Sequence, residues 1–597
     1  MEEEKKPAKE TKPGPADFEG PREVSESETS ETETSDDQQS KLKKTDSSGP
    51  SRWQRLRGWY LTHKKLSIPL TVLTILLLLA AVPFTRYAIA AVFISQDVQV
   101  QVVDSKTGTP VSDAKVVAGS GSAGNTSGTG LTTLRGVRVG PATITVTKKY
   151  YKDGQLKATI PVIKSDKALK VPLEATGRQV KVKVTNLINQ AALADVEITI
   201  ADTKAKTDKS GAAIVVLPAG SKTQAAALKL KGYNDSKVTV QISDTEVKEN
   251  AFKLTPTGHV YFLSNRNGTL DVMKSNLDGT DLKVVLAGTG NEDEYNTVLL
   301  ASRDWKYLAL LARRDDKPKV YVITTADDKL TTADEGAANF ALSGWLGSSL
   351  VYSVTRTDLS PWQTGAGKLK SYNADTGKIT TLDQTTGSGD ATLSIYEYYG
   401  LVFLSGDTVV YAKGWANQGS AYVSDYSGKQ DKIASISADG KNPKTVLAAD
   451  AATTSLDYVP YSPNALHISK LVQDAGGYQY YDYVVGSQPK QVELSQDEYY
   501  EATHTYYLSP DGKKTTWTDQ RDGKNAALVG DSTGSDSKVV KSTAGYSAFG
   551  WYTDSYLLLH KDGTELSITG TTGGTPVKIT NYQGTTGYGV VPQQGYY

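Results

Sequence analysis

Hydrophobic residues along this chain follow three patterns in succession, and the first is an uninterrupted apolar run. Residues 66–84 read LSIPLTVLTILLLLAAVPF and carry no charge. As a helix, this run of about 19 residues is roughly 28 Å long, close to the thickness of the hydrocarbon layer of a membrane. A second apolar piece, residues 87–94, follows Arg86. We therefore expect one transmembrane helix within residues 66–94.

The residues before this run predict the side of the membrane on which the chain starts. Residues 1–50 hold almost no large apolar side chains, so we expect a disordered tail. Residues 51–65 form a basic juxtamembrane segment. Because positive charge stays on the cytoplasmic side, we expect a single-pass protein of the cell membrane, with a cytoplasmic N-terminus and an extracellular C-terminal region. A cleaved signal peptide is disfavoured, since 65 residues precede the apolar run. The basic residues of the segment are Arg52, Arg55, Arg57, Lys64 and Lys65.

The second pattern is an alternation of apolar and polar residues, which is typical of half-buried β-strands. It starts with DVQVQVVD at residues 97–104 and returns with VKVKVTN at residues 180–186. Turns rich in Gly and Pro follow in a similar order in both stretches. We expect two β-sandwiches of similar length, at residues 96–176 and 178–255.

The third pattern is a strand–turn–strand unit that recurs about every 40–60 residues from residue 256 onward. Residues 259–286, HVYFLSNRNGTLDVMKSNLDGTDLKVVL, contain two hairpin turns, NRNG and NLDG. The spacing favours a β-propeller over residues 256–597 with about seven four-stranded blades, and six or eight blades stay open. The C-terminal VVPQQGYY would then join the first blade and close the ring, which removes exposed strand edges. The predicted fold class is mainly β.

Two stretches carry a resemblance to known families. VDSKTGTPVSDAKV and KSGAAIVVLPAG resemble the small Ig-like sandwiches called carboxypeptidase regulatory-like domains, and the resemblance implies spacer or binding modules. YFLSNRNGTLDVMKSNLDGT and SPDGKKTTWTDQRDGK resemble TolB-like propellers of the WD40 type. That resemblance implies work in the cell envelope through protein contacts, although a fold alone does not fix a function.

The amino-acid composition excludes several kinds of chemistry for this chain. The chain has no cysteine, which excludes disulfides, thiol catalysis and Cys-ligated metals. Its 66 basic and 66 acidic residues balance, so nothing favours nucleic acid as a partner. The GxSxG at residues 530–534 lies between two predicted strands, where a hairpin loop is favoured over a nucleophile elbow. We therefore expect no catalytic residue, no metal ligand and no cofactor.

Aromatic residues are the remaining candidates for a binding site. Tyrosines alternate in YEYY (residues 396–399) and in YQYYDY (residues 478–483), which places rings on one face of a strand. Exposed rings at a propeller rim bind glycans or proteins, whereas buried ones only pack between blades. Packing is the simpler interpretation, and predicted loops make the two tryptophans the better surface candidates. The candidate binding residues are Trp362, Trp415, Tyr396, Tyr398, Tyr480 and Tyr499.

The sequence favours a membrane-anchored binding or scaffold protein of the cell surface, with the propeller held on a stalk of sandwiches. Its expected partners are the lipid bilayer, through the anchor helix, and a protein or glycan at the propeller. The alternative is a propeller enzyme that acts on envelope glycans or small esters, with a metal or carboxylates at the central channel. A role in signalling through the tail ranks last, because the tail contains no recognisable output domain.

Overall fold

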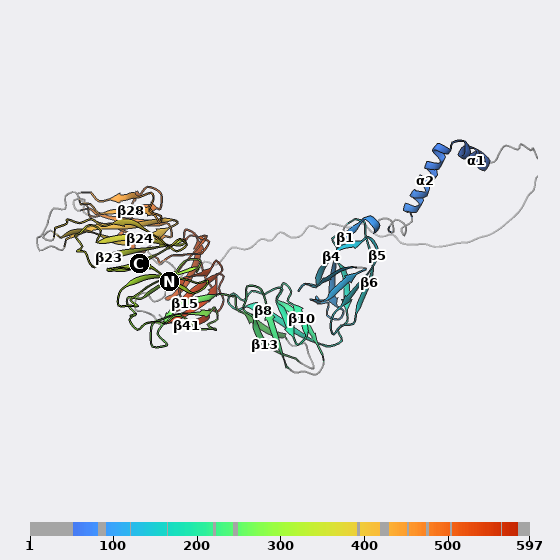
Figure 1. Cartoon of the computed structure of the whole chain (residues 1–597), viewed down its shortest axis with the longest axis horizontal. Coiled ribbons are helices and arrows are strands. Elements are labelled where there is room, and N and C mark those ends of the chain that lie inside the picture. Colours follow the sequence, from blue (N-terminus) through green and yellow to red (C-terminus); the bar gives the residue numbers. More distant parts are fainter. Residues whose placement is uncertain are drawn as a thin grey trace, which may run out of the picture. The chain divides into compact units, whose positions relative to one another are not determined.

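The structure is a computed structural model, shown in Figure 1. It describes residues 52–81, 87 and 91–582, apart from residues 120, 164, 219–222, 243–248, 391–393, 418–428, 451–452, 473–476, 502–503 and 563. The described chain is mainly β, as the sequence predicts. It divides into two compact units, Met1–Pro83 and Phe84–Tyr597. The expected disordered tail, residues 1–50, lies outside the described residues.

The described part of the first unit contains two helices. Helix α1 spans Arg52–Thr62 and α2 spans Lys64–Ala81, with Pro69 inside α2. Among the residues that the structure describes, no helix has both the length and the hydropathy needed to cross a membrane. Residues 82–86 and 88–90 of the expected span are not among those residues.

The second unit begins with a two-sheet sandwich of seven strands. One sheet has the order β4-β1-β7 and the other β3-β2-β5-β6, with β7 parallel to β1. Alternate residues of both sheets, such as Val100, Val116 and Ile144, are fully buried in one shared core. The strands are β1 (Ser95–Asp104), β2 (Lys115–Ala118), β3 (Ser122–Asn125), β4 (Leu131–Arg138), β5 (Gly140–Thr147), β6 (Gly154–Ile160) and β7 (Leu169–Leu173).

A second sandwich repeats this topology strand for strand. Its sheets are β11-β8-β14 and β10-β9-β12-β13, and β14 is parallel to β8. The two sandwiches therefore have the same strand order, as the similar order of their Gly- and Pro-rich turns suggests. The resemblance to carboxypeptidase regulatory-like domains stays a prediction. The strands are β8 (Arg178–Asn186), β9 (Glu197–Ile200), β10 (Thr203–Lys206), β11 (Ala212–Leu217), β12 (Thr223–Lys229), β13 (Ser236–Gln241) and β14 (Glu249–Leu254).

Residues at the end of the first strand of each sandwich reach the next domain. Asp104, at the end of β1, accepts a 2.8 Å hydrogen bond from the side-chain amide of Gln179 in β8. Asn186, at the end of β8, donates a 2.7 Å hydrogen bond to the hydroxyl of Tyr556 in the C-terminal domain. Ile188 follows and is fully buried in a core cluster of that domain. Polar and apolar contacts thus join the three domains in sequence.

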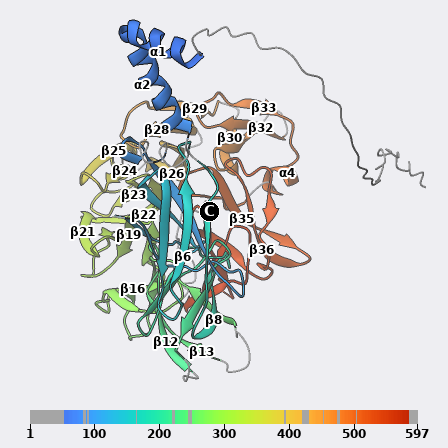
Figure 2. The ribbon, with the colours of Figure 1, turned by 90° about the vertical axis from the view of Figure 1, so that its right-hand side faces the viewer.

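Among its described residues, the C-terminal domain contains seven successive antiparallel sheets, the first of three strands and the others of four. Each is a meander of neighbouring strands, and Figure 2 shows the sheets following one another around a ring from β16 past β25, β29 and β33 to β36. This is the arrangement of a β-propeller, with the number of blades that the spacing favours. The strands of the first three sheets are β15 (His259–Ser264), β16 (Asp271–Asn276) and β17 (Lys283–Leu286); β18 (Val298–Ala301), β19 (Tyr307–Ala312), β20 (Lys319–Thr324) and β21 (Lys329–Asp334); and β22 (Ala338–Leu346), β23 (Ser349–Arg356), β24 (Gly367–Asn373) and β25 (Lys378–Gln384).

The remaining four sheets continue in the same manner, with one short helix, α4 (Gln496–Glu501), between the fifth and the sixth. The strands are β26 (Ile395–Ser405), β27 (Thr408–Asn417), β28 (Lys432–Ser437) and β29 (Lys444–Ala448); β30 (Thr453–Ser462), β31 (Ala465–Val472), β32 (Gly477–Val484) and β33 (Lys490–Val492); β34 (Tyr507–Leu508), β35 (Lys514–Arg521), β36 (Lys524–Asp531) and β37 (Lys538–Val539); and β38 (Ser547–Thr553), β39 (Tyr556–Lys561), β40 (Glu565–Gly570) and β41 (Val577–Asn581).

The first and last sheets pack against each other. Phe262 of β15 and Ile568 of β40 belong to one buried cluster, and β15 and β41 lie side by side in Figure 1. Arg266 donates hydrogen bonds to the Thr580 hydroxyl (2.9 Å) and the Asn581 carbonyl (2.8 Å) across this junction. The expected contribution of VVPQQGYY to the first blade falls on residues outside the described part of the chain.

Candidate binding surface

The meander topology gathers the candidate aromatic residues at one end of the third, fourth and fifth sheets. In every four-stranded blade, the start of the first strand, the second turn and the exit of the fourth strand lie at the same end. Trp362 lies in the second turn of the third blade, between β23 and β24. In the fourth blade, Tyr396 and Tyr398 are near the start of β26 and Trp415 is near the end of β27.

The other two candidates belong to the fifth blade. Tyr480 lies in the first half of β32, which starts at the second turn. Tyr499 lies on α4, after the fourth strand of the blade. All six candidates are therefore at the same end of their blades. Trp415 was expected in a loop but lies in a strand, because the β26–β27 hairpin continues to the pair Ile395 and Asn417.

A stack of four tyrosines covers this end of the fifth blade. The rings of Tyr478 and Tyr480 are parallel at 6.0 Å, and Tyr480 contacts Tyr499 at 5.2 Å. Tyr500 stands edge-on to Tyr499 at 5.1 Å. Tyr480 and Tyr499 are 6% and 3% exposed, whereas Tyr478 and Tyr500 are 45% and 59% exposed. Two of the candidate rings thus form the base of the stack, and their neighbours form its surface.

Neighbouring residues of the fourth blade hold the next aromatic group. Tyr398 is 45% exposed and its ring lies against Gly414, where a Cβ atom would come within 2.7 Å of the ring. Trp415 is half-buried, and the ammonium of Lys429 lies 4.7 Å from the centre of its ring. The backbone N–H of Trp415 donates a 3.0 Å hydrogen bond to Asp431. Burial raises the pKa of the Asp431 carboxyl despite this bond.

The charge of one carboxylate acts on aromatic residues of both groups. Burial raises the pKa of Tyr398 and Tyr499, and the negative charge of Asp457 on β30 adds to both shifts. Both hydroxyls therefore lie within range of the same negative charge. We call the exposed rings of Tyr398, Tyr478 and Tyr500, together with the half-buried ring of Trp415, the aromatic face.

Trp362 and Tyr396 lie together at a different part of the same end. The carbonyl of Trp362 accepts a 2.9 Å hydrogen bond from the N–H of Gly389. Gly387 lies so close to the backbone of Trp362 that a Cβ atom there would meet it at 2.1 Å, and Gly387 also forms a β-bridge with Tyr396. Both aromatic residues are half-buried. Their loops are therefore packed on each other.

A buried ion cluster supports the fourth blade beneath this surface. The Lys413 ammonium lies 2.8 Å from Glu397 and 2.9 Å from Asp383, and the lysine side chain is 4% exposed. Thr386 donates two hydrogen bonds of 2.7 Å to Glu397, from its N–H and its hydroxyl. Burial alone would raise the pKa of Glu397, but the hydrogen bonds from Lys413 and Thr386 outweigh it and the pKa is lowered. Sequence analysis missed this cluster, because its members are far apart along the chain.

The same set of residue types recurs in two other blades. Tyr399 is the cross-strand partner of Lys413, and its hydroxyl donates a 2.9 Å hydrogen bond to Asp383. In the third blade, Tyr352 pairs with Lys370, and both bind Asp334 of the preceding blade. In the first blade, Tyr261 pairs with Lys274, and both bind Asp328 of the next blade. The recurrence indicates that this set of residues joins neighbouring blades.

The GxSxG stretch and the Asp-containing turn after β16 have structural roles in turns. Residues 530–534 run from the end of β36 into the hairpin turn that leads to β37, and Asp531 accepts a 2.8 Å hydrogen bond there from the N–H of Thr533. Asp278 closes the turn after β16 by accepting a bond from the N–H of Thr280. Within the part of the chain that the structure describes, no three His, Asp or Glu side chains are grouped so that they could hold a metal ion.

No family model matches this chain, and no curated protein matches it. Similar solved structures include an oligogalacturonate lyase in complex with manganese, with 11% identity, a TM-score of 0.31, and coverage of 55% of this chain and 85% of the lyase. TolB from Acinetobacter baumannii matches with 9% identity, a TM-score of 0.24, and coverage of 52% and 74%. A puromycin-hydrolyzing peptidase of Mycobacterium tuberculosis matches with 13% identity, a TM-score of 0.32, and coverage of 55% and 52%. Such low TM-scores carry no argument about function.

Proposed function

We propose that this chain is a membrane-anchored binding protein of the cell surface, which uses the aromatic face of its propeller to contact a protein or glycan. The sandwiches hold the propeller, through contacts such as the one between Asn186 and Tyr556. The helix expected within residues 66–94 anchors the chain, and the basic segment before it keeps the N-terminus in the cytoplasm.

The observation that carries the proposal is the construction of the tyrosine stack. Tyr478 and Tyr500 expose their rings to solvent while they rest on the buried rings of Tyr480 and Tyr499. Rings held in this way lose little conformational entropy when they bind a partner. Tyrosine also combines apolar area with a hydroxyl, and this combination makes it frequent at interfaces.

The buried charges of the propeller have a structural role. Catalytic groups need access to a substrate, whereas Lys413 and Glu397 are nearly inaccessible to solvent and neutralise each other. The recurrence of the Tyr–Lys–Asp set in three blades gives these residues a common role in joining neighbouring sheets.

The test uses the full chain in detergent on an array of envelope polysaccharides, and in photo-crosslinking on intact cells with a photoreactive residue at position 398, which the variants below leave unchanged. The double variant Tyr478→Ala and Tyr500→Ala is expected to lose binding at least about tenfold, because interface aromatics commonly contribute 2 kcal/mol or more. Tyr295→Ala is the matched control, since Tyr295 is 76% exposed in the propeller but lies outside the aromatic face. Equal binding by the double variant and the control would contradict the proposal.

A further inference from the structure

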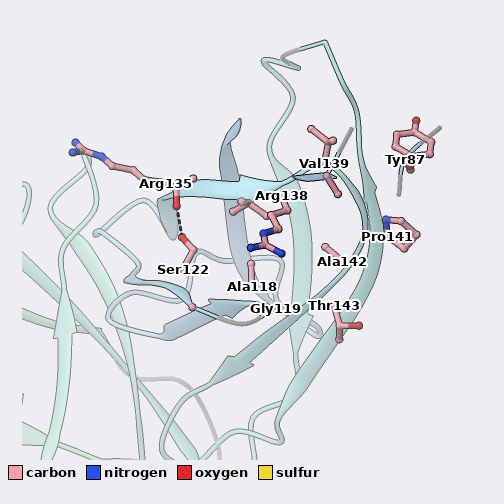
Figure 3. A pocket seen from close by; sticks show the side chains of 14 residues that line it. Tyr87, Ala118, Gly119, Ser122, Arg135, Arg138, Val139, Pro141, Ala142 and Thr143 are labelled. Carbon is pink, nitrogen blue, oxygen red and sulfur yellow. Dashed lines mark hydrogen bonds between the residues drawn. The ribbon is translucent and has the colours of Figure 1, made fainter. Parts of the chain in front are cut away.

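The first sandwich has a hollow at the end where the chain enters it. The hollow has a volume of about 680 Å³ and lies between Tyr87 and Ala91 on one side and strands β4 and β5 on the other. Figure 3 shows that Tyr87 stands beside Pro141 and Val139 at its edge. We call this end of the sandwich, with the start of β1 and the loop between β6 and β7, the entry end.

An arginine occupies the hollow without an acidic partner. Arg138, at the end of β4, is exposed, and its guanidinium lies above Ala118 in Figure 3. Arg135 on the same strand also lines the hollow, but its guanidinium points away from that of Arg138 in Figure 3, and its carbonyl accepts a 2.8 Å hydrogen bond from the Ser122 hydroxyl. Neither arginine forms an ion pair with a residue in the described part of the chain. Arg138 therefore offers its donors to an anion from outside.

Large apolar side chains surround the entry end on the outside. Ile163, in the loop between β6 and β7, is 84% exposed, and Phe93, just before β1, is also 84% exposed. The side-chain amide of Gln96 donates a hydrogen bond to the carbonyl of Val162, which fixes this loop next to the start of β1. Exposed apolar residues thus accompany a cation at one end of the sandwich.

The entry end follows the expected membrane span directly along the chain. The expected membrane span ends by residue 94 and β1 starts at Ser95, so no spacer separates the sandwich from the bilayer. A surface that combines exposed apolar side chains with basic ones is suited to the boundary between lipid headgroups and acyl chains. Arginine also forms paired hydrogen bonds with phosphate oxygens.

We propose that the entry end rests on the bilayer, with Arg138 bound to a lipid phosphate in the hollow and with Ile163 and Phe93 inserted at the headgroup boundary. This inference rests on the membrane anchoring in the proposed function. It adds that the first sandwich is docked on the membrane in one orientation, where a flexibly tethered domain would move freely above it.

The absence of cysteine allows a direct test in the full chain. Single cysteines introduced as Ile163→Cys and Lys106→Cys are labelled with an environment-sensitive fluorophore, and the chain is placed in phospholipid nanodiscs. Lys106 follows the opposite end of β1 and is exposed, so it is the matched control. Quencher lipids are expected to reduce the signal at position 163 at least about threefold more than at position 106, because only the former lies at the boundary. Equal quenching at both positions would overturn the proposal.

A third label separates this proposal from the anchoring on which it depends. Leu73→Cys places the label in the middle of the expected span. Deep quenching at position 73 without quenching at position 163 leaves the anchor in place and refutes the docking. No quenching at position 73 refutes the anchor itself.

Variants of the two arginines test the phosphate contact. In nanodiscs of phosphatidylglycerol, Arg138→Ala is expected to weaken docking, measured by access of iodide to the label at position 163, by about fivefold. Arg135→Ala is the matched control and is expected to have less effect, because the guanidinium of Arg135 points away from that of Arg138. Added inorganic phosphate should not displace the sandwich if the ligand is a lipid headgroup. Equal effects of the two variants, or displacement by phosphate, would contradict binding of a lipid phosphate by Arg138.

Discussion

Lys413 and Glu397 form a 2.8 Å ion pair that is almost completely withdrawn from solvent, with side chains 4% and 8% exposed. The pair lies on the first two strands of the fourth blade, the same strands that carry Tyr398 and Trp415. A charge in such a place is costly unless its partners remain. The cluster therefore fixes the strands that present part of the aromatic face.

Replacement of the lysine should destabilise the propeller strongly. In Lys413→Met, Glu397 and Asp383 keep their charges without a cation, so the free energy of unfolding of the propeller should fall by about 3–5 kcal/mol. Hydrogen exchange of β27 measures this change without assuming that the whole chain unfolds in one step. The exposed ion pair of Lys441 with Asp439 serves as the control, and Lys441→Met should have little effect on the free energy of unfolding, because solvent screens this pair. Similar losses in both variants would contradict the account of the buried pair.

Two carboxyls at this end of the propeller should show opposite pH dependence. The folded protein lowers the pKa of Glu397, so its stabilising effect is present above the pKa of an unfolded glutamate and is lost as the pH falls through the folded pKa. The folded protein raises the pKa of Asp431, chiefly through burial, so its contribution is present at low pH and is lost as the pH rises through the folded pKa.

Neutral amide variants check these signs. At about pH 7, Glu397→Gln should lower the melting temperature of the propeller, whereas Asp431→Asn should leave it unchanged or raise it. Both differences should shrink at about pH 3, where the carboxyls of the unfolded chain are protonated. Calorimetry at the two pH values measures the effect. A loss of stability in Asp431→Asn that equals the loss in Glu397→Gln would show that the burial of Asp431 is misjudged.

The buried and the exposed tyrosines of the stack should contribute unequally to the free energy of unfolding. Tyr480→Ala removes a ring that is 6% exposed and should cost about 3–5 kcal/mol in the free energy of unfolding. Tyr478→Ala removes the ring above it, which is 45% exposed, and should cost about 1 kcal/mol or less. Thermal unfolding of the two variants provides the comparison. If the outer ring proved as costly as the inner one, the division of the stack into base and surface would be wrong.

Thr126 and Thr207 should have equivalent roles in the two sandwiches. The hydroxyl of Thr207 donates to the Leu193 carbonyl at 2.6 Å and accepts from the Val196 N–H at 2.9 Å. Thr126 makes the same two contacts, with Val111 and Ala114. Valine at either position would leave a buried N–H and a buried carbonyl without these partners, at a cost of about 1–3 kcal/mol each.

Serine at either position keeps the hydroxyl and provides the control. Thr207→Ser should therefore retain more of the free energy of unfolding than Thr207→Val, as measured by hydrogen exchange of the second sandwich. If the serine variant were no more stable than the valine variant, the hydroxyl would have no such role.

Local sequence patterns predicted the strands well, because alternation along a strand reflects the one face that it buries. The stretch at residues 97–104 became β1 and the stretch at residues 180–186 falls within β8. The hairpin turn of residues 530–534 was also predicted correctly. Helix α4 was not predicted, since its six residues, QDEYYE, show no helical periodicity of apolar positions.

The roles of individual aromatic residues could not be read from the sequence. Alternation places Tyr478 and Tyr480 on the same face of β32. Which of the two rings is buried depends on the later segment, whose Tyr499 packs on Tyr480. The ion pairs of Lys413 could not be predicted either, because Asp383 comes from the preceding blade. Packing between segments far apart in the chain sets both features.

Cell-surface display of the aromatic face is tested most directly by labelling single cysteines in intact cells. A cysteine introduced as Tyr500→Cys should react with a membrane-impermeant maleimide before lysis, and one introduced as Ser25→Cys in the tail should react only after lysis. The natural chain contains no cysteine, so the signal comes only from the introduced residue. Labelling of the tail but not of position 500 in intact cells would contradict the proposed orientation and, with it, recognition of a partner outside the cell.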